Sequence, residues 1–341
     1  MPQSGPVAMQ IALISLAFLI SVLCAGVMGF AIQRGATCTV AAVDEVVARR
    51  GFRRLVALLE ASLWVTGGLL VAQWLHALPA MPPGYPLSAW TVVGGVLLGL
   101  GAFVNGACVF GAIALFGSGR WAQILMPAGF YLGCLTIPYV FRPSPAALPY
   151  GSPVFQTPSW LAAGFLGFVA WRLLRPLVAA SVGNAGPSLL GRIREALTSR
   201  VWAPHAATAV IGVTFLFTLL LAGAWAYTDL LAALARGMAN DVVARSALAL
   251  ALLVGAAWGG WSAGRFKGTR VTAAQAIRSL AGGALMGWGT LLIPGSNDGL
   301  ILVGMPLLWP YAWAAFFTMV LSIAAVQMAV KRVRTALPTA S

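Results

Sequence analysis

Acidic side chains are scarce in this sequence: its 341 residues include only seven Asp and Glu, against 21 Lys and Arg. Charged residues of both signs make up 8% of the chain, too few to cover the surface of a protein folded in water. Hydrophobic residues make up 60%, and the mean hydropathy is +0.90. These values exclude a water-soluble globular protein and predict an all-α integral membrane protein.

Cysteine and histidine are also rare, and their spacing excludes the common metal centres. The four cysteines form no C-x-x-C pair, and the two histidines, His76 and His205, lie near predicted helix ends without evident partners. We therefore expect no metal and no cofactor. A net charge of +14 would indicate nucleic-acid binding in a soluble protein. Here the basic residues flank apolar segments as topology signals, so we expect no nucleic-acid partner.

The chain does contain an internal repeat. Residues 94–111 read GGVLLGLGAFVNGACVFG and residues 282–299 read GGALMGWGTLLIPGSNDG, and the two stretches align without a gap. Five glycines and one leucine coincide in this alignment, and Cys108 corresponds to Ser296. We therefore predict a doubled unit in which each copy carries an apolar helix that runs into a glycine-rich break.

Apolar segments of roughly 20 residues can cross the hydrocarbon core of a bilayer. The first of them is preceded by no basic region, so we expect a retained span rather than a signal peptide. Runs such as 109–116 are too short to cross and suit re-entrant half-helices. The sequence predicts about nine transmembrane helices, at about 9–33, 53–76, 90–105, 121–140, 158–175, 206–226, 246–264, 278–293 and 310–330.

We expect one transmembrane transport domain, with repeat 1 at about 9–140, a connector helix at about 158–175 and repeat 2 at about 206–330. A polar linker at about 177–205 follows the connector. An N-terminus outside and a C-terminus in the cytoplasm would place most basic residues inside, as the positive-inside rule requires. An odd number of spans separates the starts of the two repeats. The repeats are therefore expected to be inverted, which is typical of transporters with broken helices.

Helix breaks at membrane depth are the candidate functional site. Irregular backbone is tolerated there only inside protein or beside a water-filled cavity, and half-helix N-termini favour an anionic solute. The alternative is that the glycines serve close helix packing alone. The candidate pathway residues all lie at such breaks: Cys38, Asn105, Gly106, Cys108, Gly295, Ser296, Asn297 and Asp298.

The cysteines differ in their expected roles. Cys24 and Cys134 lie within predicted spans, where a thiol is usually a small apolar filler. Cys38 and Cys108 instead lie at glycine-flanked breaks. A thiol there donates a weak, soft hydrogen bond, which suits a pathway because a solute that is held too tightly does not leave.

The intramembrane acidic residues allow two interpretations. Asp298 is a functional candidate because burying an unpaired carboxylate is costly, or it only satisfies backbone N–H groups of its turn. Glu60 and Asp229 are expected as ion partners of nearby basic residues: Arg34, Arg53 or Arg54.

Several of these motifs carry a family resemblance. RGATCTVA at 34–41, the two repeated stretches at 94–111 and 282–299, and GRFK at 264–267 resemble the YeeE/YedE family of bacterial sulfur-transport membrane proteins. Studied members of that family take up thiosulfate, and the similarity covers almost the whole chain. The resemblance implies a non-enzymatic importer of a small sulfur-containing anion in the bacterial inner membrane, built from inverted repeats. A cytoplasmic sulfur-carrier partner is also implied.

The resemblance further implies that central cysteines pass thiosulfate along by S–H···S contacts. Cys38 matches the first pathway cysteine and Cys108 the second. The third position holds Ser296, followed by Asn297 and Asp298. A hydroxyl is a harder donor than a thiol, and an ionised carboxylate would repel a dianion, so this departure bears on thiosulfate specificity.

Two other function classes stay open on the sequence. A membrane thiol–disulfide redox protein would use its cysteines as an electron relay, although such proteins usually carry closely spaced thiols. A transporter of a different small solute, or a partner-binding scaffold, would share the same composition.

Overall fold

The computed structural model describes residues 15–141, 146–182, 191, 198–238 and 241–336, and this part of the chain contains helices and loops but no strand. Seven helices in it are long and apolar enough to cross a membrane. An eighth span results if the bent pair Ala273–Leu292 and Asn297–Gly304 is counted as one. Side chains such as Leu23, Leu250 and Leu321 are more than 60% exposed, as lipid-facing residues are. The all-α membrane class is confirmed.

The described part of the first half of the chain holds seven helical elements. They are α1 (Leu16–Gly35), α2 (Thr39–Arg49), α3 (Arg53–Trp74), α4 (Ala89–Asn105), α5 (Val109–Gly117), the 3-10 helix η1 (Trp121–Ile124) and α6 (Leu125–Val140).

The second half begins after a connecting region. It holds the 3-10 helix η2 (Pro153–Gln156), α7 (Trp160–Val182), α9 (Pro204–Ala222), α10 (Tyr227–Ala235), α11 (Val242–Ser262), α12 (Ala273–Leu292), α13 (Asn297–Gly299), the π-helical turn η3 (Leu300–Gly304) and α14 (Pro310–Ala336).

The element order is the same in the two halves. The offset that aligns the repeated stretches also carries Leu16 onto Pro204, the first residues of α1 and α9. It likewise carries the first residue of α2 onto that of α10, and the first residue of α5 onto that of α13. The sequence repeat is therefore also a repeat of helix boundaries.

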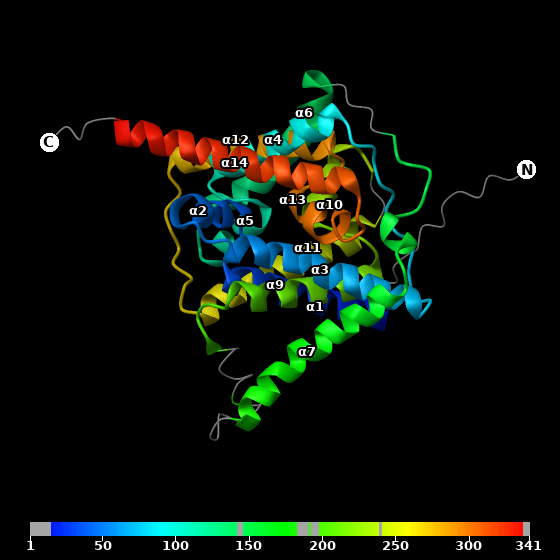
Figure 1. The fold of residues 1–341 in the computed structure, drawn as a ribbon. Coiled ribbons are helices and arrows are strands. Elements are labelled where there is room, and N and C mark those ends of the chain that lie inside the picture. Colours follow the sequence, from blue (N-terminus) through cyan, green and yellow to red (C-terminus); the bar gives the residue numbers. More distant parts are fainter. Residues whose placement is uncertain (1–14, 142–145, 183–190, 192–197, 239–240, 337–341) are drawn as a thin grey trace, which may run out of the picture.

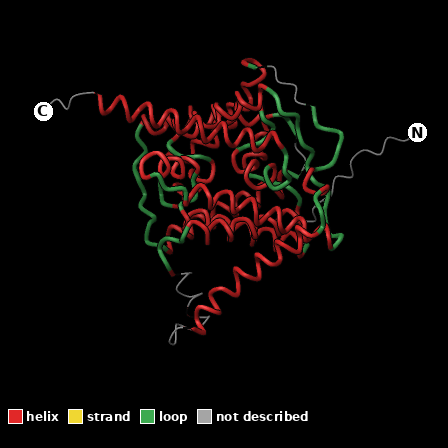
Figure 2. The backbone as a smooth tube through the Cα atoms, in the orientation of Figure 1, coloured by secondary structure: helices red, strands yellow, loops and turns green. Residues whose placement is uncertain are grey.

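The long helices form two layers with four short helices between them. One layer contains α6, α12, α4 and α14, and the other contains α11, α1, α9 and α3, with neighbours in contact in these orders. Figures 1 and 2 show α2 and α5 between the layers toward the C-terminal end of the chain, and α10 and α13 between them on the other side. The short helices, which carry the predicted breaks, thus lie inside the molecule.

Glycine brings α4 and α12 into close contact. A Cβ added at Gly101 would lie 2.6 Å from the carbonyl oxygen of Gly282, and one added at Gly289 would lie 2.6 Å from that of Gly94. The start of α4 therefore crosses the end of α12, so the two helices run antiparallel. The helical glycines of the repeated stretches serve close backbone packing, as the packing interpretation expected. This leaves the breaks themselves as candidate pathway elements.

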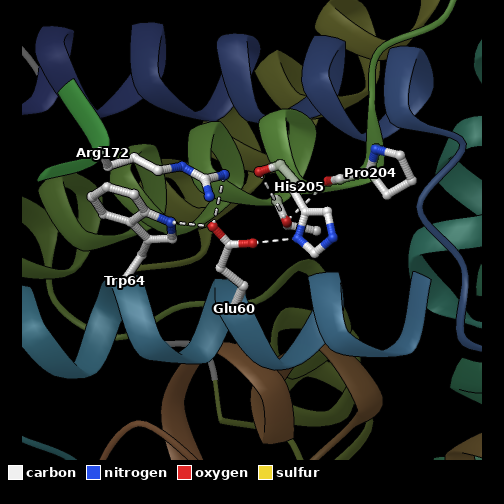
Figure 3. A network of polar contacts seen from close by, with 6 residues as sticks. Glu60, Trp64, Arg172, Pro204 and His205 are labelled. Atoms are coloured by element: carbon white, nitrogen blue, oxygen red, sulfur yellow. Dashed lines mark hydrogen bonds and ion pairs between the residues drawn. The ribbon is translucent and has the colours of Figure 1, made fainter. Parts of the chain in front are cut away.

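A polar network anchors the oblique helix α7 to the rest of the molecule (Figure 3). Glu60 on α3 lies between Arg172 of α7, at 3.0 Å, and His205 of α9, whose Nδ1 is 2.5 Å from the carboxylate. Trp64 Nε1 also donates to Glu60, at 3.4 Å. The expectation that Glu60 pairs with Arg34, Arg53 or Arg54 is wrong, and His205 does have a partner. Sequence reasoning missed both because the partners come from helices distant along the chain.

Arg34 is buried and has other partners. Its guanidinium donates to the carbonyl of Ser199 and, at 2.9 Å, to the hydroxyl of Ser262, and it lies over the ring of Phe30.

Some predicted boundaries differ from those observed. The polar linker expected from 177 begins later, because α7 continues to Val182. Most of that linker, and residues 9–14 of the first predicted span, lie outside the described residues.

Candidate functional site

The first break lies between α4 and α5. Gly106 follows the last residue of α4 with φ +77°, a left-handed conformation that glycine adopts without strain. The side chain of Asn105 then holds the turn, because its amide donates to the carbonyl of Ala107 at 2.9 Å and to Gln123 Oε1 at 3.1 Å. Cys108 occupies the N-cap position of α5 and is fully buried.

The second break lies between α12 and α13, where the two helical segments bend by 49°. Ser296 occupies the N-cap position of α13, as Cys108 does for α5, which confirms their structural equivalence. The backbone N–H of Gly295 donates to the carbonyl of Thr290 at 3.0 Å and so closes the turn before the cap.

Thr39 connects the two breaks. Its backbone N–H donates to Cys108 Sγ at 3.1 Å, and its hydroxyl donates to Asn297 Oδ1 at 3.3 Å. Cys38, the N-cap residue of α2, lies beside Cys108, because the next residue, Thr39, contacts Cys108 Sγ. Gly111 permits this approach, because a Cβ there would lie 2.5 Å from Cys38 Sγ. The first turn of α2 therefore joins two thiols of the first break to an amide of the second.

A second cluster forms on the other side of the second break. Thr228 on α10 lies with its hydroxyl oxygen 2.7 Å from both Ser296 Oγ and Asp298 Oδ1. Ser296 Oγ is 2.5 Å from Asp298 Oδ1 and accepts from the backbone N–H of Gly299 at 3.4 Å. All three polar side chains of this cluster are buried.

A large cavity, here called the Arg236 cavity, opens beside this cluster. It has a volume of about 800 Å³, and Arg236, Arg245, Asp229, Cys134, Gly295 and Gly299 are among the residues that line it. Two arginines make this cavity attractive to anions. Asp229 lies at the inner end, because a Cβ on Gly299 would be 3.8 Å from its carboxylate.

A smaller cavity, here called the Arg53 cavity, lies near Cys38. It has a volume of about 500 Å³, and its lining includes Gly35, Ala36, Arg49, Arg53 and Arg54. A narrow space of about 10 Å³ lined by Cys38, Gly35 and Ala36 adjoins it. Between the two cavities Cys108, Ser296 and Asn297 have no exposed surface, so the structure is closed there.

Among the residues that the structure describes, two polar groups at the breaks have no hydrogen-bond partner. They are Asn297 Nδ2 and Asn105 Oδ1, both of them buried. Burying such groups unpaired is costly, so a donor without an acceptor at the centre of the molecule is a place for a ligand oxygen or sulfur.

The predicted residues thus fall into four groups. The Thr39 contacts bring together Cys38, Cys108 and Asn297, and the Thr228 contacts bring together Ser296 and Asp298. Gly295 lines the Arg236 cavity. Asn105 and Gly106 shape the first break, but the hydrogen bonds of Thr39 and Thr228 described here do not include them. Cys24 is half-buried on α1.

Sequence reasoning missed several residues of this site: Thr39, Thr228, Arg236 and Arg245. It also took Cys134 for a filler, whereas its thiol donates to the Gly287 carbonyl at 3.7 Å and the residue lines the Arg236 cavity. A signal was available for the two threonines, because the repeat offset makes α10 the equivalent of α2 and each begins at a break. Within the described residues, no group of three His, Cys, Asp or Glu side chains could hold a metal ion.

Comparison with known proteins bears on this site. A family model described as sulphur transport matches residues 34–325, nearly the whole chain. A search of the curated proteins finds no match.

Proposed function

The chain belongs to the sulphur-transport family, and on that premise we propose that it imports a small sulfur-containing anion, thiosulfate or a related sulfur oxyanion. The family and the apolar helices make it a multi-pass membrane protein of sulfur transport. The resemblance to the YeeE/YedE family is confirmed.

One observation carries the proposal: the two helix breaks meet between two cavities, with thiols on one side and hydroxyls on the other. Cys38, Cys108 and Asn297 converge on Thr39, and Ser296 lies at the equivalent break. A thiosulfate ion has a soft sulfur end and a hard oxygen end, which this asymmetry suits. Weak S–H donors would bind the sulfur without holding it, as a conducting pathway requires.

The proposed pathway begins in the Arg236 cavity and ends in the Arg53 cavity. Arginines at each end concentrate anions by electrostatic attraction. The central contacts open to let one anion through. On the side of the Arg53 cavity the anion would be received by a cytoplasmic sulfur-carrier protein.

We propose nine spans in the bacterial inner membrane, arranged as two inverted repeats with the N-terminus outside and the C-terminus in the cytoplasm. The antiparallel crossing of the equivalent helices α4 and α12 supports the inversion. The segment Trp160–Arg172 of α7 is apolar but short, and in this arrangement α7 is the connector between the repeats. The arginines of the Arg53 cavity lie on the cytoplasmic side, as the positive-inside rule favours.

Growth tests this function directly. A bacterium that lacks its own sulfate and thiosulfate importers should grow on thiosulfate as sole sulfur source when it expresses this chain. Cys38→Ala and Cys108→Ala should abolish growth, while Cys24→Ala at matched expression should preserve it. Failure of the parent chain to support growth, or full growth with both alanine variants, would contradict the proposal.

A redox function is the second candidate, because the fold brings Cys38 and Cys108 close together although they are far apart in sequence. A thiol–disulfide exchange protein forms a mixed disulfide that is trapped when the resolving cysteine is removed. We expect Cys38→Ser and Cys108→Ser to trap no partner under non-reducing electrophoresis. A trapped adduct specific to one of these variants would favour the redox function.

A further inference from the structure

Three side-chain oxygens at the second break lie within hydrogen-bonding distance of one another. Their two hydroxyl groups carry too few protons for three hydrogen bonds. The three contacts among Thr228 Oγ1, Ser296 Oγ and Asp298 Oδ1 measure 2.7, 2.7 and 2.5 Å. These are lengths of full O–H···O hydrogen bonds, and each bond requires a proton. The two hydroxyls supply only two. One Thr228 proton shared between two acceptors would leave both bonds long, whereas both are short.

A protonated carboxyl completes this ring. Thr228 then donates to Ser296, Ser296 donates to Asp298, and the carboxyl O–H of Asp298 donates back to Thr228. Asp298 is only 4% exposed, and within the described residues no Lys, Arg or His lies at ion-pair distance from it. A buried carboxylate with no cation is unfavourable, whereas in the neutral acid each proton of the ring has an acceptor.

The other titratable groups near Asp298 do not supply a positive charge. Tyr227 and Asp229 face it from α10, and Cys108 lies near Tyr227 from the start of α5. The positive charges of Arg236 and Arg245 instead interact electrostatically with the carboxyl group of Asp229. No positive charge at Asp298 therefore compensates an ionised carboxylate.

One titratable side chain lies between the Arg236 cavity and the ring. Asp229 is half-buried, lines the Arg236 cavity and lies close enough to Asp298 to interact with it electrostatically. It thus stands between the water of that cavity and the buried carboxyl. Beside the ring, the unpartnered Asn297 Nδ2 indicates where an anion oxygen or sulfur is received.

We propose that Asp298 is a proton-binding site and that its carboxyl must be protonated for an oxyanion to pass the second break. This inference rests on the proposed function, because it assigns the ion on which that transport depends. An ionised Asp298 would repel a dianion in the low-dielectric interior, whereas the neutral acid offers it an O–H donor. Since the proton arrives from the Arg236 cavity, the pH on that side controls uptake.

Uptake of radiolabelled thiosulfate into proteoliposomes tests the inference. With the internal pH fixed, raising the external pH from about 6 to about 8 should slow the parent by up to about tenfold per pH unit. Uptake falls as the external pH rises because transport needs one bound proton. Thiosulfate itself stays a dianion over this pH range. Asp298→Asn is permanently neutral and should lose the pH dependence, with uptake at high pH equal to or above that of the parent.

Asp44→Asn is the matched control, because it makes the same change at an exposed position of α2 and should keep the parental decline. A parent that takes up thiosulfate with no pH dependence, or Asp298→Asn variants that follow the parent, would overturn the proton site. A parent that takes up no thiosulfate at any pH would instead contradict the proposed function.

Infrared spectroscopy tests the proton site independently of the proposed transport function, since it needs no transport. The C=O stretch of a protonated carboxyl should be present in the parent at neutral pH, lost in Asp298→Asn and retained in Asp44→Asn. Identical carboxyl bands in the parent and Asp298→Asn would overturn the proton site even if transport is confirmed.

Discussion

At the scale of single residues, the centre of the molecule combines two kinds of hydrogen-bond donor. Cys108 and Ser296 occupy equivalent N-cap positions, yet one offers a soft thiol and the other a hard hydroxyl. Thr39 links the thiol of the first break to the polar side chains of the second, because it contacts both Cys108 and Asn297. In the proposed pathway, selectivity between the sulfur and oxygen ends of an anion would therefore depend on a few side chains.

Replacing the hard donor should increase thiosulfate transport. In Ser296→Cys the second break would carry a thiol like the first, and we expect thiosulfate uptake to rise roughly 2- to 13-fold, because one hydrogen bond contributes about 0.5–1.5 kcal/mol. Competition by unlabelled sulfate in the same uptake assay measures the change in selectivity. If Ser296→Ala matches the parent and Ser296→Cys gains nothing, Ser296 does not contact the anion.

The thiols should differ in their access to reagents. Cys38 is half-buried at the narrow space beside the Arg53 cavity, and Cys134, although buried, lines the Arg236 cavity and keeps 2% of its surface exposed, whereas Cys108 has no exposed surface. A small membrane-impermeant thiol reagent should therefore label Cys38 and Cys134 from opposite sides of the membrane, and Cys108 most slowly. Mass spectrometry of inside-out and right-side-out vesicles measures this. Labelling of both from one side would contradict the pathway.

The sequence indicated the breaks and their cysteines but not the residues that complete the site. Cys108 and Ser296 stood out because they interrupt a repeated glycine pattern. Thr228 and Arg245 carry no such signal, since a threonine or an arginine near a helix end is common. Their role arises because α10 contacts the second break and α11 packs against α10, which brings together residues distant along the chain.

At the scale of helices, close glycine contacts hold the layer that carries both breaks. Gly101 cannot accept a side chain, because an added Cβ would lie 2.6 Å from the Gly282 carbonyl oxygen and 2.8 Å from the backbone nitrogen of Met286. Both neighbours are backbone atoms of α12, so the helices must move apart. The geometry of both breaks therefore depends on this crossing.

Gly101→Ala should destabilise the folded protein by about 1–3 kcal/mol, the range for overpacking a tight interior. Gly164→Ala is the matched control, because a Cβ at that α7 position meets no atom within 4 Å. The control should be neutral or slightly stabilising, since alanine favours the helix. Thermal unfolding in detergent measures both. Equal unfolding of Gly101→Ala and the control would show that the crossing is not tight.

The connector helix α7 should depend on Glu60. Its carboxylate bridges Arg172 and His205, so Glu60→Gln should cost about 1–3 kcal/mol through the donors left unsatisfied. Glu45→Gln removes a more exposed pair with Arg54, at 3.4 Å, and should cost less than about 1 kcal/mol. Hydrogen exchange along α7 should rise in Glu60→Gln alone. Unchanged exchange would show that aromatic contacts suffice to hold α7.

Helix positions were largely predictable from hydropathy, and helix contacts were not. The breaks at Gly106 and Gly295 were expected from the glycine-rich pattern, and the short helix after the first break from the length of the run 109–116. Pairing in the membrane, by contrast, follows small residues and buried polar groups rather than hydrophobicity. For this reason the partners of Glu60 and Arg34 were assigned wrongly.

At the scale of the whole molecule, the repeat determines both the layers and the site. Equivalent helices begin at equivalent residues, and α4 crosses α12 antiparallel. Two copies inserted in opposite directions would bring their half-helices together at the middle of the membrane, which is where transporters bind their substrates. The sequence predicted this doubling because its glycines align without a gap.

Topology reporters test the inverted arrangement. Fusions after Arg50 and Arg334 should report the cytoplasm, and fusions in the loop 77–88 should report the outside, because the basic residues stay on the cytoplasmic side. Reports from the same side for both sets would contradict the inverted repeats and the span count.

Uptake of radiolabelled thiosulfate into liposomes that contain only the purified chain tests sulfur-anion transport most directly. The parent should show saturable uptake above empty liposomes. Cys108→Ala should reduce it roughly 10- to 150-fold, the loss expected for a hydrogen bond to a charged group. Cys24→Ala should match the parent. Uptake no greater than in empty liposomes, or equal uptake by Cys108→Ala and the parent, would contradict the proposed pathway.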